Sequence, residues 1–371
     1  MFENVKKNFG FGCMRLPMIE KDVDYELVNQ MVDTFIENGF NYFDTAHGYV
    51  GELSEVAVRK CLVERYERDK YFLVNKLTHH YIKKEEDIIP FFENQLKICG
   101  VEYFDLYLMH SQGANNYPFM KDIHAYETVY NLKKEGRIKH FGISFHDKPE
   151  VLDLILTEHP EIECVQIQLN YIDYEDEAIQ SRKVLEVCRK HNKPAIVMEP
   201  VKGGSLVNLP NKGNEILSAL EGGSNASYAL RFAAGCEGVK MVLSGMSNME
   251  QLLDNINTFK DFKPLNEVEM KAIDEVIASI HELNLIPCTA CRYCVDGCPM
   301  KINIPELFAC MNAKKIYNSW NTDFYYNSVV TKHTGKALDC IKCGKCETAC
   351  PQHLEIRDLL VQVANEFEVK K

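Results

Sequence analysis

The sequence predicts an α/β protein in which a closed (β/α)₈ barrel, the TIM-barrel architecture, is followed by a small, mostly helical module. Short apolar runs alternate with stretches of helical period over residues 24–260. This alternation is typical of repeated βα units on a parallel sheet. Eight such runs occur, which is the number of strands that closes this barrel. Eight of the 15 cysteines form two tight groups near the C-terminus and mark the second module.

The strand-like runs begin with Gly10–Leu16, which is the weakest of them. The other seven are Asn41–Asp44, Tyr71–Leu77, Phe104–Met109, His140–Phe145, Cys164–Leu169, Ala195–Met198 and Val239–Leu243. The runner-up arrangement is an open doubly wound sheet, which favours a G-x-G-x-x-G turn after an early strand. The sequence contains no such turn, so the closed barrel is the better prediction.

Helical periodicity predicts a helix at Asp24–Asn38, with apolar residues on one face and Gly39 as a stop signal. A second helix is predicted at Asn266–Glu282, shortly before the first cysteine group. We therefore expect the barrel domain to occupy residues 1–283 and the cysteine-rich domain residues 284–371. Within the latter, Ile304–Tyr317 and Leu354–Phe367 are predicted to be helical.

The composition excludes several classes of function. A formal net charge of −12 argues against a nucleic-acid partner, because such a partner selects a basic face. No apolar run approaches the roughly 20 residues that span a bilayer, so no membrane segment is expected. The first residues lead into Gly10 without the apolar stretch of a secretory signal. We therefore expect a cytoplasmic protein, whose cysteines stay reduced rather than form disulfides.

Four polar residues follow three consecutive predicted strands. Asp44 closes the second strand, and Tyr49 lies in the loop beyond it. Lys76 ends the third strand, and His110 ends the fourth. Each of these residues alone is more often structural than catalytic. Because the active sites of βα barrels lie at the C-terminal ends of the strands, the four side chains are expected to meet at one mouth of the barrel.

Together the four residues predict a general acid for a carbonyl oxygen. A tyrosine hydroxyl titrates at about 10, which is high for proton donation at neutral pH. The ammonium group of Lys76 would favour the tyrosinate and lower this pKa, and Asp44 would hold the lysine in place. His110 would orient the carbonyl group by hydrogen bonding.

The C-terminal cysteines form two copies of a C-x₂-C-x₂-C-x₃-C-P run. In this run three close cysteines hold one [4Fe–4S] cubane and the fourth reaches the other cubane. The predicted ligand sets are Cys288, Cys291, Cys294 and Cys350 for one cluster, and Cys340, Cys343, Cys346 and Cys298 for the other. Paired C-x₂-C units also suit zinc, but a zinc site needs neither the further cysteines nor the prolines behind them. The module resembles helical dicluster ferredoxin domains and is predicted to carry two [4Fe–4S] clusters.

An ordered set of motifs resembles those of the aldo-keto reductases. In chain order they are Gly12–Pro17, Asp44–Tyr49, Gly51–Glu55, Lys76, Leu108–His110, Gly136–Ser144 and Gln166–Asn170. The resemblance extends from about residue 9 to about residue 260, and the ordered set is far more specific than any single piece. It implies that the catalytic tetrad is Asp44, Tyr49, Lys76 and His110, with the tyrosine as proton donor.

The resemblance also implies a nicotinamide cofactor, NADPH or NADH, that supplies hydride to the carbonyl carbon. The cofactor-binding residues implied are Gly12, Met14, Arg15, Ser144, Gln166, Met198, Pro200, Lys202, Ser247, Asn248, Gln251 and Asn255. Within this set, Gln166 matches a partner of the carboxamide group. Met198 stands where the family often stacks an aromatic ring on the nicotinamide, and residues 244–255 match the adenosine-binding end.

Two departures from the family pattern concern the cofactor. After Ser144 the family usually places an asparagine, whereas Phe145 and His146 follow here. The adenosine-binding end lacks the lysine and arginine that commonly clamp the 2′-phosphate of NADPH, because Gly245 and Gln251 occupy those places. A phosphate without a cationic partner is poorly held, so the choice between NADPH and NADH stays open.

The predicted function is an oxidoreductase that reduces a carbonyl group, or oxidises an alcohol, of a small molecule with a nicotinamide cofactor. The two clusters would serve electron transfer or structure. A ferredoxin or a flavoprotein is the expected electron partner, since each cubane passes one electron while a hydride carries two. The alternative is an electron-transfer protein in which the barrel is a non-catalytic docking scaffold. The intact tetrad argues against this alternative.

Overall fold

The computed structural model describes residues 3–176, 179–317 and 320–369. The chain divides into two compact units, one of Met1–Pro200 with Ala226–Leu265 and the other of Val201–Asn225 with Asn266–Lys371. Each unit is therefore built from two separate stretches of chain. The expected boundary between residues 283 and 284 falls within the second unit, and as a boundary between independently folding domains it stays a prediction.

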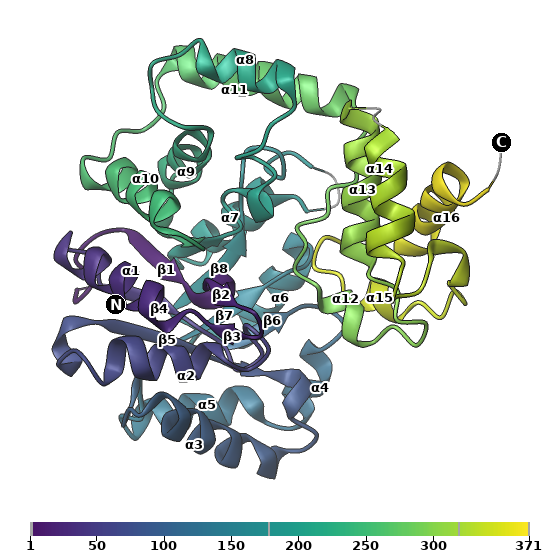
Figure 1. Ribbon diagram of the computed structural model, residues 1–371. Helices are drawn as coiled ribbons and strands as arrows, with labels where there is room; N and C mark the ends of the chain where they lie inside the picture. The colour runs from purple at the N-terminus through teal and green to yellow at the C-terminus, as the bar shows by residue number, and fades with distance from the viewer. Residues whose placement is uncertain (1–2, 177–178, 318–319, 370–371) are drawn as a thin grey trace. The chain divides into compact units, whose positions relative to one another are not determined.

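Eight parallel strands form a closed barrel in the first unit (Figure 1). They are β1 (Phe9–Gly12), β4 (Tyr42–Asp44), β5 (Phe72–Thr78), β6 (Phe104–Gln112), β7 (Ile138–Phe145), β8 (Cys164–Gln168), β9 (Ala195–Met198) and β10 (Val239–Gly245). Neighbouring strands follow one another along the chain, and β10 closes the barrel by pairing with β1. The predicted fold class is confirmed.

The first strand is where sequence and structure differ most. Its predicted span was Gly10–Leu16, but β1 ends at Gly12 and Cys13–Arg15 form a 3₁₀ turn, η1. Cys13 and Leu16 are both buried, so the apolar pattern continues beyond the point where the strand ends. A short antiparallel hairpin, β2 (Met18–Ile19) and β3 (Asp22–Val23), follows and was not expected.

Alternate strand residues fill the interior of the barrel. The buried interior cluster consists of Tyr42, Phe72, Val74, Leu106, Leu108, Cys164, Ile196, Met241 and Leu243. Successive side chains of a strand point to opposite faces, so a residue two positions after an interior one also points inward. Asp44 follows Tyr42 in this way, Lys76 follows Val74, and His110 follows Leu108. The polar residues therefore form a layer on the apolar one, at the C-terminal ends of the strands.

Helices surround the strands of the first unit (Figure 1). They are α1 (Tyr25–Glu37), α2 (Ser54–Val58), α3 (Ile88–Cys99), α4 (Tyr117–Asp122), α5 (Ala125–Lys134), α6 (Pro149–Glu158), α7 (Ser181–Lys190), α9 (Asn225–Gly235) and α10 (Met249–Lys260). The predicted helix at Asp24–Asn38 corresponds to α1. Asp24 caps it by accepting a hydrogen bond from the Leu27 N–H at 3.0 Å, and Asn38 ends it.

The second unit is helical. Its helices are α8 (Asn211–Ser218), α11 (Glu267–Glu282), α12 (Tyr293–Asp296), α13 (Ile304–Tyr317), α14 (Trp320–Tyr325), α15 (Lys345–Thr348) and α16 (Ile356–Phe367). The helices α8 and α11 lie side by side (Figure 1). The helices α13 and α16 pack around a core that includes Leu307, Phe308 and Leu360. The helix α13 has the predicted bounds, whereas α16 begins two residues later than predicted.

Among the described residues, no helix is both long and apolar enough to cross a membrane.

Candidate active site and cluster sites

The ammonium group of Lys76 is buried at the rim of the barrel. Its side chain is 0% exposed, and Nζ donates to Asp44 Oδ1 at 2.6 Å and to the Thr45 carbonyl oxygen at 2.8 Å. Burial lowers the pKa of Lys76, while the neighbouring Asp44 carboxylate raises it. A buried charge is tolerated only when it is paired and hydrogen-bonded, and both conditions are met here.

Tyr49 and His110 lie close to this ion pair. The Lys76 Nζ is 4.7 Å from the centre of the Tyr49 ring, whose centre is 5.9 Å from that of the His110 ring. The structure thus brings the four expected residues together. Shielding from water raises the pKa of Tyr49 well above its usual value, and the Asp44 carboxylate adds to this. The lowering of the Tyr49 pKa expected from Lys76 is not found, because burial raises this pKa most strongly and Asp44 raises it further.

The imidazole of His110 is held by a residue that the sequence did not single out. Its Nδ1 lies 2.8 Å from the Thr78 hydroxyl oxygen. Burial lowers the pKa of His110 well below its usual value, and the Lys76 charge adds to this, so the ring is neutral at neutral pH. Thr78 is two positions after Lys76 on β5, and strand alternation was the signal that it faces the same site.

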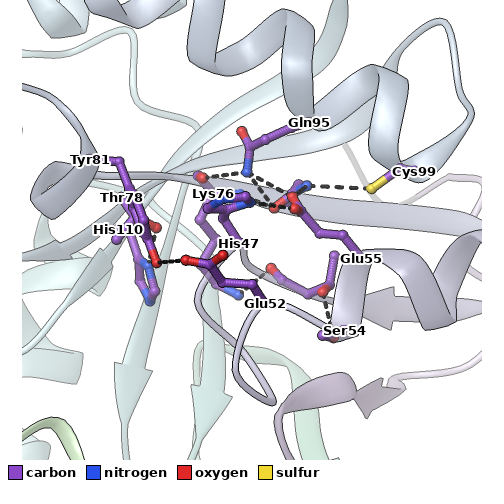
Figure 2. Close-up of polar contacts among 12 residues, drawn as sticks. His47, Glu52, Ser54, Glu55, Lys76, Thr78, Tyr81, Gln95, Cys99 and His110 are labelled. Atoms are coloured by element: carbon purple, nitrogen blue, oxygen red, sulfur yellow. Dashed lines mark hydrogen bonds and ion pairs between the residues drawn. The ribbon is translucent and has the colours of Figure 1, made fainter. Parts of the chain in front are cut away.

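A second buried carboxylate, Glu55, lies close to His47 and Gln95 (Figure 2). It accepts hydrogen bonds from Asn75 Nδ2 at 2.7 Å and Gln95 Nε2 at 3.0 Å. His47 Nδ1 lies 2.6 Å from the other carboxylate oxygen. This bond raises the pKa of His47. The network joins residues from three separate stretches of sequence, so no local pattern predicted it.

Glu199 also escaped the sequence analysis. Its carboxylate adds a small contribution to the raised pKa of Tyr49, after burial and Asp44. Its backbone has φ 57°, a left-handed conformation that is costly for a residue with a side chain and occurs often at functional sites.

Several residues expected to bind the nucleotide meet where β10 passes into α10. The Ser247 hydroxyl donates to the Arg15 carbonyl oxygen at 2.8 Å, and the Ser247 N–H donates to Gln251 Oε1 at 2.8 Å. Asn248 caps α10 by accepting from the Gln251 N–H at 2.9 Å. Gly12 lies opposite Gly245 in the register of β1 and β10. We call this group the Arg15 corner.

The other expected nucleotide residues of the first unit are placed as follows. Gln166 Nε2 donates to Asp44 Oδ2 at 3.0 Å, which ties it to the tetrad, and Ser144 lies opposite Gln166 in the register of β7 and β8. Asn255 Nδ2 donates to the Ser244 hydroxyl at 3.0 Å in the buried interior. Met14 lies in η1, Met198 ends β9, and Pro200 follows it.

Lys202 is the one expected nucleotide residue that falls in the second unit. It is buried in the turn η6 (Lys202–Gly204), and its Nζ donates to Gln352 Oε1 at 3.2 Å. The next residue, Gly203, has φ +64°, and a Cβ there would overlap the Thr289 carbonyl oxygen. Thr289 and Gln352 follow Cys288 and Pro351 closely in sequence, so this turn packs against two cysteine-bearing segments.

Two cavities in the second unit are lined by the two expected cysteine sets. Cys288, Cys291, Cys294 and Cys350 line the first. Cys298, Cys340, Cys343 and Cys346 line the second. Each cavity therefore takes three cysteines from one run and the fourth from the other run. This exchange of the fourth cysteine between the two runs is how two [4Fe–4S] clusters are held by such runs, whereas a zinc site does not require it.

Known families match both parts of the chain. Residues 8–278 match the Aldo/keto reductase family, and residues 287–355 match the 4Fe-4S dicluster domain. Protein REDOX 2 of Catharanthus roseus is 26% identical over 292 residues, which cover 72% of this chain and 84% of that protein. The 9,11-endoperoxide prostaglandin H2 reductase of Trypanosoma cruzi is 24% identical over 245 residues, 65% of this chain and 79% of that protein.

Solved structures share the fold. An aldo-keto reductase of Klebsiella pneumoniae in complex with NADPH superposes with a TM-score of 0.60 at 20% identity, over 73% of this chain and 90% of that one. The family match covers most of the chain, and the barrel has the architecture of these structures. The chain belongs to the aldo/keto reductase family and carries a 4Fe-4S dicluster domain after its barrel.

Proposed function

We propose that the protein reduces the carbonyl group of a small molecule with a nicotinamide cofactor, and that Tyr49 supplies the proton. The observation that carries this proposal is the buried ion pair beneath Tyr49, in which Lys76 Nζ lies 2.6 Å from Asp44 Oδ1. Apolar residues of similar size often stabilise a core as well as a buried ion pair does. The stability of the fold therefore does not require the ion pair of Lys76 and Asp44. Proton transfer from Tyr49 does require a nearby cation.

Each member of the tetrad has its own task. The nicotinamide, when bound, supplies hydride to the carbonyl carbon. Tyr49 gives its proton to the carbonyl oxygen, which becomes far more basic as negative charge develops on it. The raised pKa of Tyr49 keeps the proton in place until then. Lys76 stabilises the tyrosinate that remains, and Asp44 keeps Lys76 charged.

His110 orients the carbonyl oxygen in this proposal. When the Thr78 hydroxyl donates to Nδ1, the proton of the neutral ring is on Nε2. The Nε2–H group can then donate to the substrate oxygen. Because the pKa of His110 is lowered, this arrangement persists through neutral pH.

The nucleotide is proposed to bind with its adenosine end at the Arg15 corner and its nicotinamide near Ser144, Gln166 and Met198. Backbone and side-chain hydrogen bonds already fix Ser247 and Gln251 there. Binding of NADPH by the Klebsiella pneumoniae relative supports a nicotinamide cofactor. The lysine and arginine that commonly clamp the 2′-phosphate are replaced here by Gly245 and Gln251. Arg15 is the cation that this corner offers to a 2′-phosphate instead.

The two cysteine-lined cavities are proposed to hold one [4Fe–4S] cluster each, and the clusters to exchange electrons with a carrier. Together two cubanes accept two electrons, which is the number carried by one hydride. The reduced cysteines that this chemistry needs are those of a cytoplasmic protein.

The test is an anaerobic titration of the purified holoprotein with NADPH and with NADH, followed by binding and by cluster absorbance. Nucleotide binding supports the reductase. Bleaching of the clusters would show that electrons pass from nicotinamide to iron, and binding without bleaching would mean that barrel and clusters act separately. Failure of both nucleotides to bind would overturn the reductase and favour the electron carrier with a scaffold barrel.

Replacement of the proposed proton donor gives a sharper prediction. In Tyr49→Phe the ring remains but the hydroxyl is lost, so kcat should fall by about 10²–10⁴-fold. Nucleotide affinity should stay within a factor of about 3, because the hydroxyl acts only in the chemical step. Steady-state rates on a panel of aldehydes and ketones would measure this. A variant that keeps its kcat would exclude Tyr49 as the donor.

A further inference from the structure

The two sets of cluster cysteines differ in the exposure of one member. In the cavity of Cys288, Cys291, Cys294 and Cys350, each cysteine is buried or half-buried. In the other cavity Cys343 is exposed. Electron transfer between proteins weakens steeply with distance, so the second cavity is the one that a partner can approach closely.

Basic residues lie beside this second cavity. Residues 330–346 carry four lysines and a single aspartate, whereas the whole chain has a net charge of −12. Lys345 lines the cavity, and Lys342 directly precedes Cys343 in sequence. Within the part of the chain that the structure describes, neither lysine has a carboxylate partner.

The acidic groups nearby are already engaged. Glu347 pairs with Arg357 at 2.7 Å, and Asp339 accepts a hydrogen bond from the Lys336 N–H at 2.7 Å. Arg357 also lines the cavity, but Glu347 neutralises it. Asp339 keeps its negative charge, so the positive charge of Lys342 and Lys345 beside Cys343 is opposed by this one carboxylate.

Apolar side chains lie among these charges. Ile341 is 60% exposed and Met300 is 37% exposed, and both line the second cavity. Small exposed apolar groups within a charged rim are typical of brief electron-transfer contacts, which bury less than about 1,200 Å². We call Met300, Ile341, Lys342, Cys343 and Lys345 the cluster-two face.

We infer that the cluster-two face docks an acidic one-electron carrier protein. The inference rests on the proposed function, because it requires a cluster in the second cavity. One electron passes from the reduced cluster to the oxidised carrier: the cluster is oxidised by one electron and the carrier is reduced by one. No bond forms or breaks, and no proton moves.

Charge explains why the carrier is acidic and why it approaches here. The net charge of −12 repels an acidic protein over most of the surface, so a local basic face attracts it in one orientation. Steering of this kind raises association rates by about 10–10³-fold and weakens as salt rises. A basic carrier would instead be drawn to the rest of the molecule, away from Cys343.

The experiment uses reduced holoprotein and two inorganic oxidants of opposite charge, ferricyanide and hexaammineruthenium(III). Stopped-flow absorbance follows cluster oxidation while salt rises from about 10 mM to about 1 M, which shortens the screening length from about 30 Å to about 3 Å. For ferricyanide we expect the rate to fall by about tenfold over this range. For the cationic oxidant we expect no fall.

Charge reversal at the face is compared with a matched reversal elsewhere. In the double variant Lys342→Glu with Lys345→Glu, the rate of cluster oxidation by ferricyanide should no longer fall as salt rises. The control variant Lys260→Glu with Lys271→Glu changes the net charge by the same amount at exposed positions. In this control the ferricyanide rate should still fall as salt rises. If the first double variant loses its clusters, Lys342→Gln with Lys345→Gln is used, and the salt dependence should at least halve.

The final step replaces the inorganic oxidants by proteins, a small acidic ferredoxin and the basic cytochrome c. The ferredoxin should exchange electrons faster at low salt and lose this advantage in Lys342→Glu with Lys345→Glu. Equal effects of the two double variants, or a ferricyanide rate in the wild type that does not fall as salt rises, would overturn the docking inference alone. Because the assay contains no nicotinamide, loss of carbonyl reduction does not affect it. A wild-type protein without clusters would overturn this inference together with the cluster part of the proposed function.

Discussion

At the scale of single residues, each buried charge of the site has its own ionic or hydrogen-bonding partners. Lys76 has Asp44 and the Thr45 carbonyl oxygen as acceptors. Asp44 in turn receives Gln166 Nε2 on its second oxygen, so both of its oxygens are used. A buried carboxylate that loses its cation keeps the full cost of desolvation, and breaking such a pair costs about 3–5 kcal/mol.

This matching predicts the outcome of removing the charges singly and together. Lys76→Met should lower the free energy of unfolding of the barrel by about 3 kcal/mol, because Asp44 is left buried without its cation. In Lys76→Met with Asp44→Asn the charge is gone as well, so about half of that loss should return. Anaerobic urea unfolding followed by tyrosine fluorescence measures both. An additive double variant would show that the two side chains do not interact.

The bond between His47 and Glu55 makes stability depend on pH. The pKa of His47 is raised in the folded state by its hydrogen bond to Glu55. Its contribution to stability is therefore complete below the unfolded value of about 6.5 and is lost as pH rises through the raised folded value. His47→Gln should lower Tm more at pH 6 than at pH 8.5.

The size of this effect follows from the bond that is lost. A difference of about 1 kcal/mol corresponds to about 2–4 °C in a unit of this size. Differential scanning calorimetry of wild type and variant at the two pH values measures it. His281→Gln, at an exposed position of α11, serves as the control. A Tm difference that is the same at both pH values would contradict the assignment.

At the scale of elements, the turn η6 shows most clearly what its packing requires. Gly203 combines φ +64° with a position at which a Cβ would meet the Thr289 carbonyl oxygen, and Thr289 adjoins Cys288. Gly204 has φ +99°, but a Cβ there would meet no atom within 4 Å. A side chain at position 204 would therefore cost free energy through its backbone conformation alone, whereas one at position 203 would also collide with Thr289.

Alanine substitution at each position tests this separation. Gly204→Ala should cost about 1–2 kcal/mol for the left-handed conformation alone. Gly203→Ala should cost more and should displace Thr289, so the iron content per chain should fall toward that of a single cluster. Iron quantitation and visible absorbance after anaerobic reconstitution give the comparison. Equal iron in the two variants would contradict a role of the Thr289 contact in cluster binding.

Elements with a strong local pattern could be predicted from the sequence, and those defined by contacts could not. The helix α13 has its predicted bounds, because its apolar period and its ends are local features. The predicted end of β1 was wrong. Cys13 and Leu16 are buried beyond the strand, and an apolar pattern alone does not distinguish a strand from a buried turn. The role of Lys202 in nucleotide binding stays a prediction, whereas its bond to Gln352 could not be predicted, because it spans 150 positions.

The candidate site shows the same division. Asp44, Lys76 and His110 could be predicted to share one face, because each ends a strand and strand side chains alternate. Thr78 was within reach of the same rule. The Glu55 network was not, because Gln95 on α3 and Asn75 on β5 meet Glu55 only in the folded barrel. The pKa of Tyr49 also could not be inferred, since its direction depends on burial and not on the neighbouring lysine alone.

At the scale of the whole molecule, the chain is organised by contacts rather than by sequence order. The segment Val201–Asn225 interrupts the barrel repeat, yet it belongs to the unit that contains the cysteines. Its turn η6 is bonded to Gln352 and packed on Thr289, both of which lie beyond residue 283. A chain cut at the expected boundary therefore keeps this segment but loses the residues that hold its turn.

This loss predicts how a truncated chain behaves under proteolysis. In the full-length holoprotein Lys202 is buried, whereas Lys212 is exposed and paired with Glu282 at 3.0 Å. Limited trypsin digestion should therefore cut after Lys212 before Lys202. In residues 1–283 alone, Gln352 and Thr289 are absent, and Lys202 should be cut at least tenfold faster, because cleavage follows the population of the open form. Mass spectrometry of the early fragments measures both rates. If Lys202 stays protected in the shorter chain, residues 1–283 fold independently and the boundary expected from the sequence is the correct one.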